Sequence, residues 1–298
     1  MKQPIFRGSG TALVTPFFSD GAIDYASLGR LIDLQIASKT DALIPCGTTG
    51  ESATMSEKER LSVIEYTVKR VAGKIPVIAG TGTNNTAQSV SLTKQAKSLG
   101  ADGVLAVCPY YNKPDQRGLE KHYQALADCQ IPVLVYNVPS RTGCTVSAQT
   151  LKKLSFHPYI AGLKDAGGSL QSAATVRHLC GDDLPLYSGD DGCIVPFLSI
   201  GGVGVISVVS NILPRAVHNL CQRWFSGDET GAAKIQLRLM PVISALFSKT
   251  NPIPVKAALE FLGYEPQALR LPLCPLPEEE KQDLFRVLKE WTDNDDGA

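Results

Sequence analysis

The chain alternates short apolar runs with longer amphipathic segments, and this alternation is its strongest large-scale pattern. The runs are rich in Val, Ile, Leu and Ala and lack a strict polar alternation, which is typical of parallel strands buried on both faces. Eight such runs cover residues 10–17, 42–46, 76–80, 103–108, 132–138, 160–164, 184–188 and 203–209.

Helix-start residues precede the amphipathic segments between these runs. Asp24, Ser56 and Asn85 stand before the predicted helices 25–38, 57–71 and 87–99. Eight strand–helix units of this length predict an α/β fold, a (β/α)₈ TIM barrel. A doubly wound open sheet is the alternative, but no Gly-x-Gly-x-x-Gly sequence follows the first run.

The barrel pattern ends near residue 225, so we expect a catalytic barrel over residues 1–225 and a small α-helical extension over 226–298. Helices are predicted in this extension at 228–249, 254–262 and 278–293. No Gly/Ser-rich linker separates the two parts.

Composition narrows the function classes. The 298 residues include 29 basic and 29 acidic side chains, and no basic tract favours nucleic acid as a partner. The eight cysteines form no Cys-x-x-Cys pair, and the four histidines lack metal-ligand spacing, so we expect no metal site. No signal sequence or membrane-length apolar run is present, and a cytoplasmic location is expected.

Lys164 is the most informative residue, because it ends the apolar run before Asp165. Desolvation there would lower the pKa of its ammonium and free the amine as a nucleophile. The alternative is a lysine that reaches solvent or pairs with Asp165. In barrels of this kind, catalytic groups gather at the carboxyl ends of strands. Other candidate residues at these ends are Thr48, Thr49, Tyr110, Tyr111, Tyr136, Arg141 and the run Gly189-Asp190-Asp191.

Each of these residues also has a purely structural interpretation. The sequence Gly47-Thr48-Thr49-Gly50-Glu51 could hold a carboxylate with hydroxyl and backbone donors, or could be a simple strand-to-helix turn. Tyr136 could be a core residue, and Arg141 a surface arginine. Together, a lysine, a tyrosine, a hydroxyl loop and an arginine at one barrel mouth indicate Schiff-base chemistry on a carboxylated ketone.

These motifs resemble the Schiff-base pyruvate lyase and aldolase superfamily and, within it, the dihydrodipicolinate synthase family. The resemblance rests on the Gly47–Glu51 sequence, on the run Tyr-Asn-Val-Pro-Ser-Arg-Thr-Gly at 136–143, and on Gly162-Leu163-Lys164-Asp165, and it extends over nearly the whole chain. It implies condensation of pyruvate with L-aspartate 4-semialdehyde to 4-hydroxy-tetrahydrodipicolinate, the first committed step of lysine and diaminopimelate biosynthesis. It also implies a homotetramer built from dimers.

The resemblance implies the following roles. Lys164 forms the Schiff base, and Tyr136 is the general acid and base, linked through Thr48 to Tyr111, which enters the site of a neighbouring subunit. Pyruvate is held by Thr48 and Thr49, and the semialdehyde carboxylate by Arg141. The carbonyls of Gly189 and Ile206 border the pocket. The iminium is the electron sink, so no metal or organic cofactor is required.

The departures from the family pattern concern feedback inhibition by lysine. Ala53, Asn84 and Tyr110 fit the lysine-sensitive pattern, whereas Glu57, Arg60 and Gln88 do not. We therefore expect weak or absent feedback. Two alternatives stay open: another pyruvate lyase, for N-acetylneuraminate or a 2-keto-3-deoxy sugar acid, and an inert carboxylate-binding barrel. Arg141 speaks against the first, and the complete set of Lys164, Tyr136 and Thr48 against the second.

Overall fold

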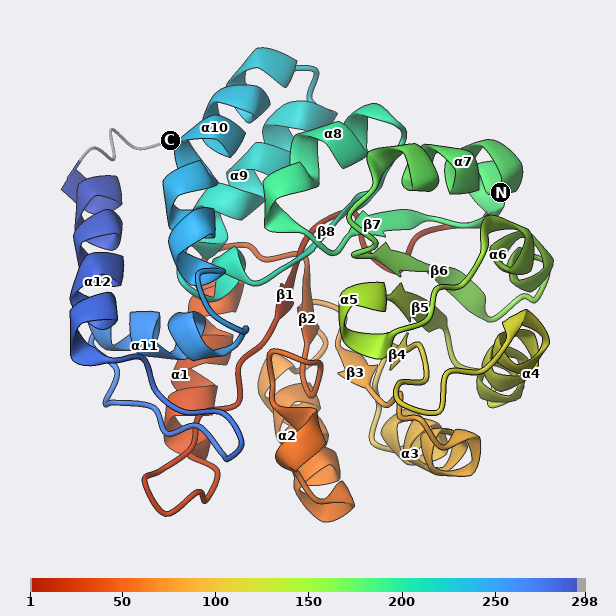
Figure 1. Cartoon of the computed structure of the whole chain (residues 1–298), viewed down its shortest axis with the longest axis horizontal. Coiled ribbons are helices and arrows are strands. Elements are labelled where there is room, and N and C mark those ends of the chain that lie inside the picture. The colour runs from red at the N-terminus through yellow and green to blue at the C-terminus, as the bar shows by residue number, and fades with distance from the viewer. Residues whose placement is uncertain (1, 294–298) are drawn as a thin grey trace.

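The computed structural model describes residues 2–293, which form a closed barrel ringed by helices (Figure 1). The α/β barrel prediction is confirmed. The strands are β1 Gly8–Ala12, β2 Ala42–Ile44, β3 Ile78–Gly80, β4 Gly103–Val107, β5 Val133–Asn137, β6 Ile160–Asp165, β7 Leu186–Ser188 and β8 Gly204–Ser207.

All neighbouring strands are parallel, in the order β2-β1-β8-β7-β6-β5-β4-β3. A parallel bridge between Leu43 of β2 and Val77, just before β3, closes the cylinder. Strand β5 pairs with β6 so that Tyr136 lies opposite Lys164. This register brings the two most informative residues of the sequence to one end of the barrel.

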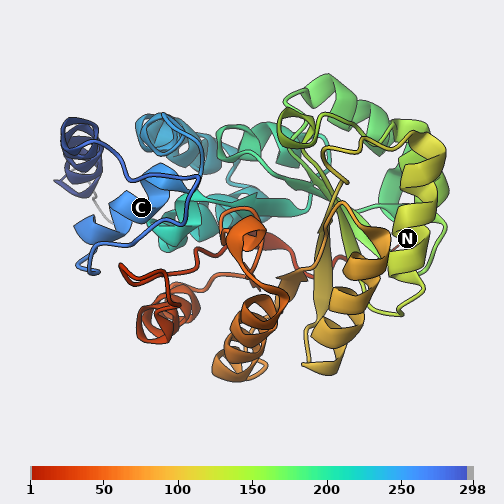
Figure 2. The same ribbon diagram turned by 60° about the horizontal axis from the view of Figure 1, so that its bottom comes forward.

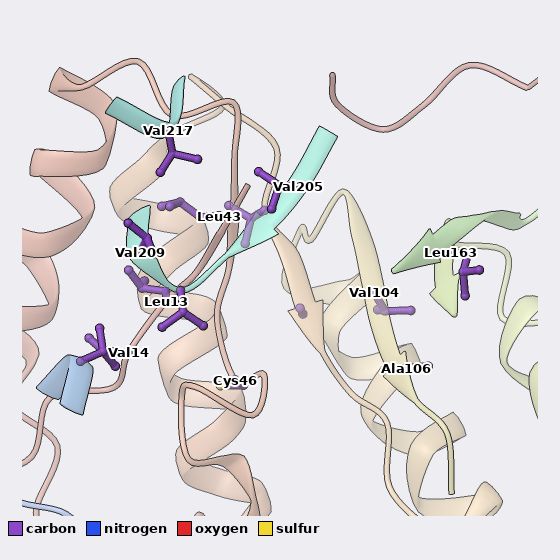
Figure 3. Close-up of a cluster of buried hydrophobic side chains, with 14 of the residues drawn as sticks. Leu13, Val14, Leu43, Cys46, Val104, Ala106, Leu163, Val205, Val209 and Val217 are labelled. Atoms are coloured by element: carbon purple, nitrogen blue, oxygen red, sulfur yellow. The ribbon is translucent and has the colours of Figure 1, made fainter. Parts of the chain in front are cut away.

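Two apolar cores explain the lack of polar alternation along the strands. The smaller core fills the barrel, where Tyr187 stacks on Phe6 with ring centroids 4.5 Å apart and donates a hydrogen bond to the Phe6 carbonyl. The larger core lies between the barrel and the helices, and Figure 3 shows part of it, with Val205 of β8 near Val217. Strands buried on both faces are therefore apolar at nearly every position.

The helices of the barrel are α1 Tyr25–Ala37, α2 Glu57–Val71, α3 Thr86–Ser98, α4 Gln116–Ala127, α5 Pro139–Thr142, α6 Ala148–Ser155, α7 Leu170–Cys180, α8 Ile194–Ser199 and α9 Pro214–Phe225. The predicted start signals are confirmed: Asp24 and Asn85 accept backbone hydrogen bonds at the starts of α1 and α3, and Ser56 forms a capping box with Glu59.

The first strand lies earlier than the sequence predicted. The apolar run 10–17 suggested a strand there, but β1 is Gly8–Ala12, and Leu13, Val14 and Phe17 are buried in the connection that follows it. Burial of this connection gives it a strand-like composition. The apolar pattern alone does not distinguish a strand from a buried connection.

After α9 the chain continues through α10 Glu229–Leu246, α11 Ile253–Phe261 and α12 Glu278–Asp293. These helices lie together at one side of the barrel in both views (Figures 1 and 2). The three helices were expected, whereas the division at residue 225 stays a prediction, and residues 294–298 of the predicted extension lie outside the described residues. Within residues 2–293, no helix combines the length and apolarity that a membrane span requires.

Candidate active site

A cavity of about 790 Å³ opens at the carboxyl ends of the strands. It brings together six residues proposed from the sequence: Thr48, Thr49, Tyr136, Arg141, Lys164 and Gly189. They lie at or just after the carboxyl ends of strands β2, β5, β6 and β7, so the strand-end argument located them in space although they are far apart in the chain.

Lys164 is buried in the wall of this cavity, with 6 % of its surface exposed. Its Nζ lies 4.3 Å from the centroid of the Tyr136 ring. Burial lowers the pKa of Lys164 from 10.5 to about 8; nearby Asp191 acts in the opposite direction, and Arg141 lowers the pKa further. Because of this lowered pKa, a larger fraction of the Lys164 amine is uncharged and nucleophilic near neutral pH than in a solvent-exposed lysine.

Tyr136 is buried against the ammonium of Lys164 and forms a hydrogen bond with the side chain of Thr48. Burial raises the pKa of Tyr136 above its usual 10, although Arg141 and the Thr48 hydrogen bond both lower it. The phenol therefore carries its proton at neutral pH. Its position allows it to give that proton to, and take one from, a group bound at Lys164.

Arg141 and Thr49 both contact Asn251, which precedes α11. An Arg141 Nη2 group donates to the Asn251 carbonyl at 3.0 Å, and the Asn251 side-chain amide donates to Thr49 Oγ1 at 2.9 Å. Asn251 Oδ1 is buried without a hydrogen-bond partner. Asn251 of the C-terminal extension thus links Thr49, which is predicted to bind pyruvate, to Arg141, which is predicted to bind the semialdehyde carboxylate.

The loop that carries Thr48 and Thr49 is anchored by a buried ion pair. Glu51 and Lys256 of α11 form this pair, and each side chain is 1 % exposed. Glu51 has a positive φ of 55°, and the Arg270 backbone N–H also donates to its carboxylate, at 3.2 Å. Gly50 suits the close packing beside it, because a Cβ there would lie only 3.1 Å from the Cys46 nitrogen and from the Leu13 carbonyl.

Two predicted site residues lie outside this cavity. Ile206 belongs to the core inside the barrel, with 1 % of its surface exposed. Tyr111 is 89 % exposed and has a positive φ of 71°. A ring presented to solvent in this way is compatible with insertion into a neighbouring subunit, which stays a prediction.

The residues singled out for lysine feedback separate into two groups. Ala53, Arg60 and Tyr110 line a second cavity of about 210 Å³ beside Thr48, whereas Asn84, Glu57 and Gln88 are not among its lining residues. Arg60 is buried, donates to the Gly80 carbonyl at 2.7 Å, and leaves its Nε without a partner. Burial lowers the pKa of Arg60, and no acidic residue lines this cavity.

Sequence reasoning assigned no role to several residues that form the site. Asp191 is buried and accepts hydrogen bonds from Ser207 and from the backbone of Val208 at 2.9 Å, so it ties the end of β7 to that of β8. Burial raises the pKa of Asp191. The extension contributes further lining residues, namely Met240, Ile243, Ser244, Phe247 and Asn251. In the sequence, only the acidic pair Asp190-Asp191 after β7 pointed to a role for Asp191.

The described residues contain no cluster of three or more His, Cys, Asp or Glu side chains that could hold a metal ion. The cavity instead presents an amine, a phenol, hydroxyls and a guanidinium. These groups suit covalent capture of a carbonyl next to a carboxylate.

Comparisons with known proteins agree with this geometry. The model of the dihydrodipicolinate synthetase family matches residues 5–291. The 4-hydroxy-tetrahydrodipicolinate synthase of Caldicellulosiruptor saccharolyticus is 47 % identical over 97 % of this chain and 98 % of its own. Among solved structures, dihydrodipicolinate synthase from Aquifex aeolicus superposes with a TM-score of 0.94 at 43 % identity, covering 96 % of this chain and 98 % of that one.

A second similar solved structure is a complex with pyruvate. The chloride-inhibited dihydrodipicolinate synthase from Acinetobacter baumannii, complexed with pyruvate, has a TM-score of 0.93 at 39 % identity and covers 96 % of this chain and 99 % of that one. Because the family model and these relatives extend over almost the full length, this chain belongs to the dihydrodipicolinate synthetase family.

Proposed function

We propose that this enzyme condenses pyruvate with L-aspartate 4-semialdehyde to 4-hydroxy-tetrahydrodipicolinate through a Schiff base on Lys164. The observation that carries the proposal is the buried amine of Lys164, held 4.3 Å from the Tyr136 ring in a cavity that also contains Arg141. Relatives that are 46–47 % identical to this chain bear the name of this activity.

The first half-reaction uses Lys164 and Tyr136. The neutral amine adds to the ketone carbon of pyruvate, and loss of water gives an iminium. Tyr136 carries protons to and from the departing oxygen, and Thr48 holds the phenol in place. The iminium withdraws electrons from C3, so that loss of a C3 proton gives an enamine.

The second half-reaction joins the two substrates. The enamine carbon attacks the aldehyde carbon of the semialdehyde, and the new alkoxide takes a proton from the Tyr136 phenol. Arg141 binds the semialdehyde carboxylate and fixes its orientation. The amine of the joined product then attacks the iminium carbon, which closes the ring and releases Lys164 as a free amine.

Two measurements test this proposal. Borohydride with pyruvate should add mass at Lys164, and Lys164→Ala should lose both adduct and turnover. A pyruvate adduct on another lysine would overturn the mechanism. A coupled assay should find turnover with aspartate semialdehyde and none with N-acetylneuraminate or 2-keto-3-deoxygluconate, and the reverse preference would favour a sugar-acid lyase.

Arg141 is tested by comparing the two half-reactions. Arg141→Ala should reduce turnover of the semialdehyde by about 10²-fold or more, as expected when a charged partner of a carboxylate is lost. Trapping of pyruvate on Lys164 should change far less. Equal loss in both assays would contradict the role assigned to Arg141.

We further propose that the enzyme works as a homotetramer built from dimers in the cytoplasm, and that lysine inhibits it weakly or not at all. The exposed ring of Tyr111 supports a partner subunit, and eight free cysteines favour a reducing compartment. The buried charge of Arg60, with no acid lining its cavity, disfavours a cationic effector. Sedimentation velocity tests the assembly, and a monomeric, fully active enzyme would refute it.

A further inference from the structure

Two cysteines far apart in the sequence meet beside the active site. Cys108 directly follows β4 and is fully buried, and Cys144 lies between α5 and α6, partly exposed. Their Sγ atoms are 3.2 Å apart, although 36 positions separate them in the chain. Both are free thiols in this structure.

The surroundings distinguish the two thiols. Cys144 Sγ donates to the Pro109 carbonyl at 3.1 Å, and its partial exposure gives small oxidants access. Burial raises the pKa of Cys108, so that thiol keeps its proton and is a poor first target. The difference in exposure therefore sets the order of reaction: Cys144 reacts first with the oxidant, and Cys108 is the resolving thiol.

We propose that Cys108 and Cys144 are an oxidation site that closes to an intrachain disulfide when the enzyme meets hydrogen peroxide. Peroxide first oxidises the Cys144 thiol to a sulfenic acid and releases one water. The Cys108 thiol then attacks the sulfenic sulfur, forming the S–S bond and releasing a second water. Two thiols and one peroxide thus give one disulfide and two waters, and a dithiol reductant reverses the change.

The bond would act on the substrate site through the chain on either side. Cys108 precedes the Tyr110–Tyr111 segment, and its backbone N–H donates to the Tyr136 carbonyl at 2.9 Å. Cys144 lies three positions after Arg141, and its carbonyl accepts from Thr142 Oγ1 at 2.9 Å. A disulfide has an S–S length of about 2.05 Å, so the sulfurs must approach by about 1 Å.

This movement should affect Arg141, which lies three positions before Cys144, more than Lys164, which lies on β6, a strand that holds neither cysteine. Displacing a positioning group by about 1 Å can reduce a rate by up to ~10²-fold. We expect oxidation to reduce semialdehyde turnover by about tenfold or more, while pyruvate trapping on Lys164 persists. This consequence rests on the proposed function, whereas the disulfide itself does not.

The test uses the full-length enzyme treated with hydrogen peroxide, alkylated and digested with trypsin. Cys108 and Cys144 fall on separate peptides, 98–117 and 142–152, each with a single cysteine. The expected product is the linked pair of peptides, about 2 Da lighter than their sum. Dithiothreitol should release both peptides and restore turnover. If both cysteines stay alkylated as free thiols while others are oxidised, the proposal fails.

Variants separate this site from the remaining thiols. Cys144→Ser should abolish the cross-link and the loss of turnover, and Cys274→Ser, which removes an exposed thiol, should change neither. A doubled mass on a non-reducing gel, from Cys144 of two copies, would overturn the intrachain assignment. A complete cross-link with unchanged turnover would refute control of activity. Absence of any pyruvate adduct in the reduced enzyme would instead refute the proposed function.

Discussion

Burying the ammonium of Lys164 should cost the enzyme stability, and the cost should depend on pH. Burial lowers the pKa of Lys164 from 10.5 to about 8. Each pKa unit corresponds to about 1.4 kcal/mol, so the charged form is disfavoured in the folded state by about 3 kcal/mol. Lys164→Met keeps an unbranched side chain of similar length and removes the charge. It should therefore raise the free energy of unfolding at pH 7.

The sign of the pH dependence follows from the lowered pKa. Between about pH 8 and 10.5 the unfolded chain binds the Lys164 proton and the folded enzyme does not, so stability of the wild type rises with pH across this window. The advantage of Lys164→Met should be full, about 3 kcal/mol, below pH 8 and should vanish near pH 10.5. Lys256 titrates in both proteins, and its contribution cancels in the difference.

Urea unfolding at fixed protein concentration, from pH 6.5 to 10.5, measures this difference. Exposed Lys94 offers a matched control, since Lys94→Met should change stability by less than about 0.5 kcal/mol at every pH. A stability difference for Lys164→Met that is constant across the range would refute the reasoning. Its value would then report packing of methionine and not the burial of a charge.

Four further outcomes are expected. The rate of borohydride-trapped pyruvate adduct should rise with pH through an apparent pKa of about 8, that of Lys164, and a midpoint near 10.5 would contradict the burial argument. Glu51→Gln should destabilise the enzyme by about 3–5 kcal/mol in urea unfolding, because it leaves the Lys256 charge buried and unpaired, whereas combining it with Lys256→Met should recover part of the loss. Tyr111→Phe should reduce steady-state turnover by about 10²-fold if its hydroxyl belongs to the proton relay of a partner subunit, and an unchanged turnover would remove it from that relay. Millimolar L-lysine should leave initial rates unchanged, and saturable inhibition would show that the charge of Arg60 does not exclude a cationic effector.

The barrel was predictable because parallel strands covered by helices must be apolar on both faces. The same rule misplaced β1, since Leu13 and Phe17 are buried in a connection that packs like a strand. Helix boundaries were recovered where a side chain caps the backbone, as Ser56 and Glu59 do for α2. A helix cap can be recognised in the sequence, because its hydrogen bonds join residues that are close in the chain. The burial of an irregular segment depends on the whole fold and cannot be recognised in this way.

The site was predictable where strand ends position it. Lys164 and Tyr136 lie near the carboxyl ends of β6 and β5, and Arg141 follows β5, so their meeting is expected from barrel geometry. Asn251 and Lys256 lie instead on the extension. Their partners in the barrel, Arg141 and Glu51, stand more than 100 positions earlier in the sequence. Nothing local marks Lys256 as a buried partner of Glu51, because a lysine on an amphipathic helix ordinarily faces solvent.

The charges of the cavity suggest why pyruvate should react before the semialdehyde. Arg141 adds to the effect of burial in lowering the pKa of Lys164, which favours the neutral amine before a substrate is bound. Once the iminium forms, a second positive charge is fixed near the guanidinium, which favours arrival of a carboxylate. Binding of the semialdehyde carboxylate to Arg141 then offsets that repulsion and leaves the iminium as the electron sink. A single arginine thus serves first to release the amine and later to admit the second substrate.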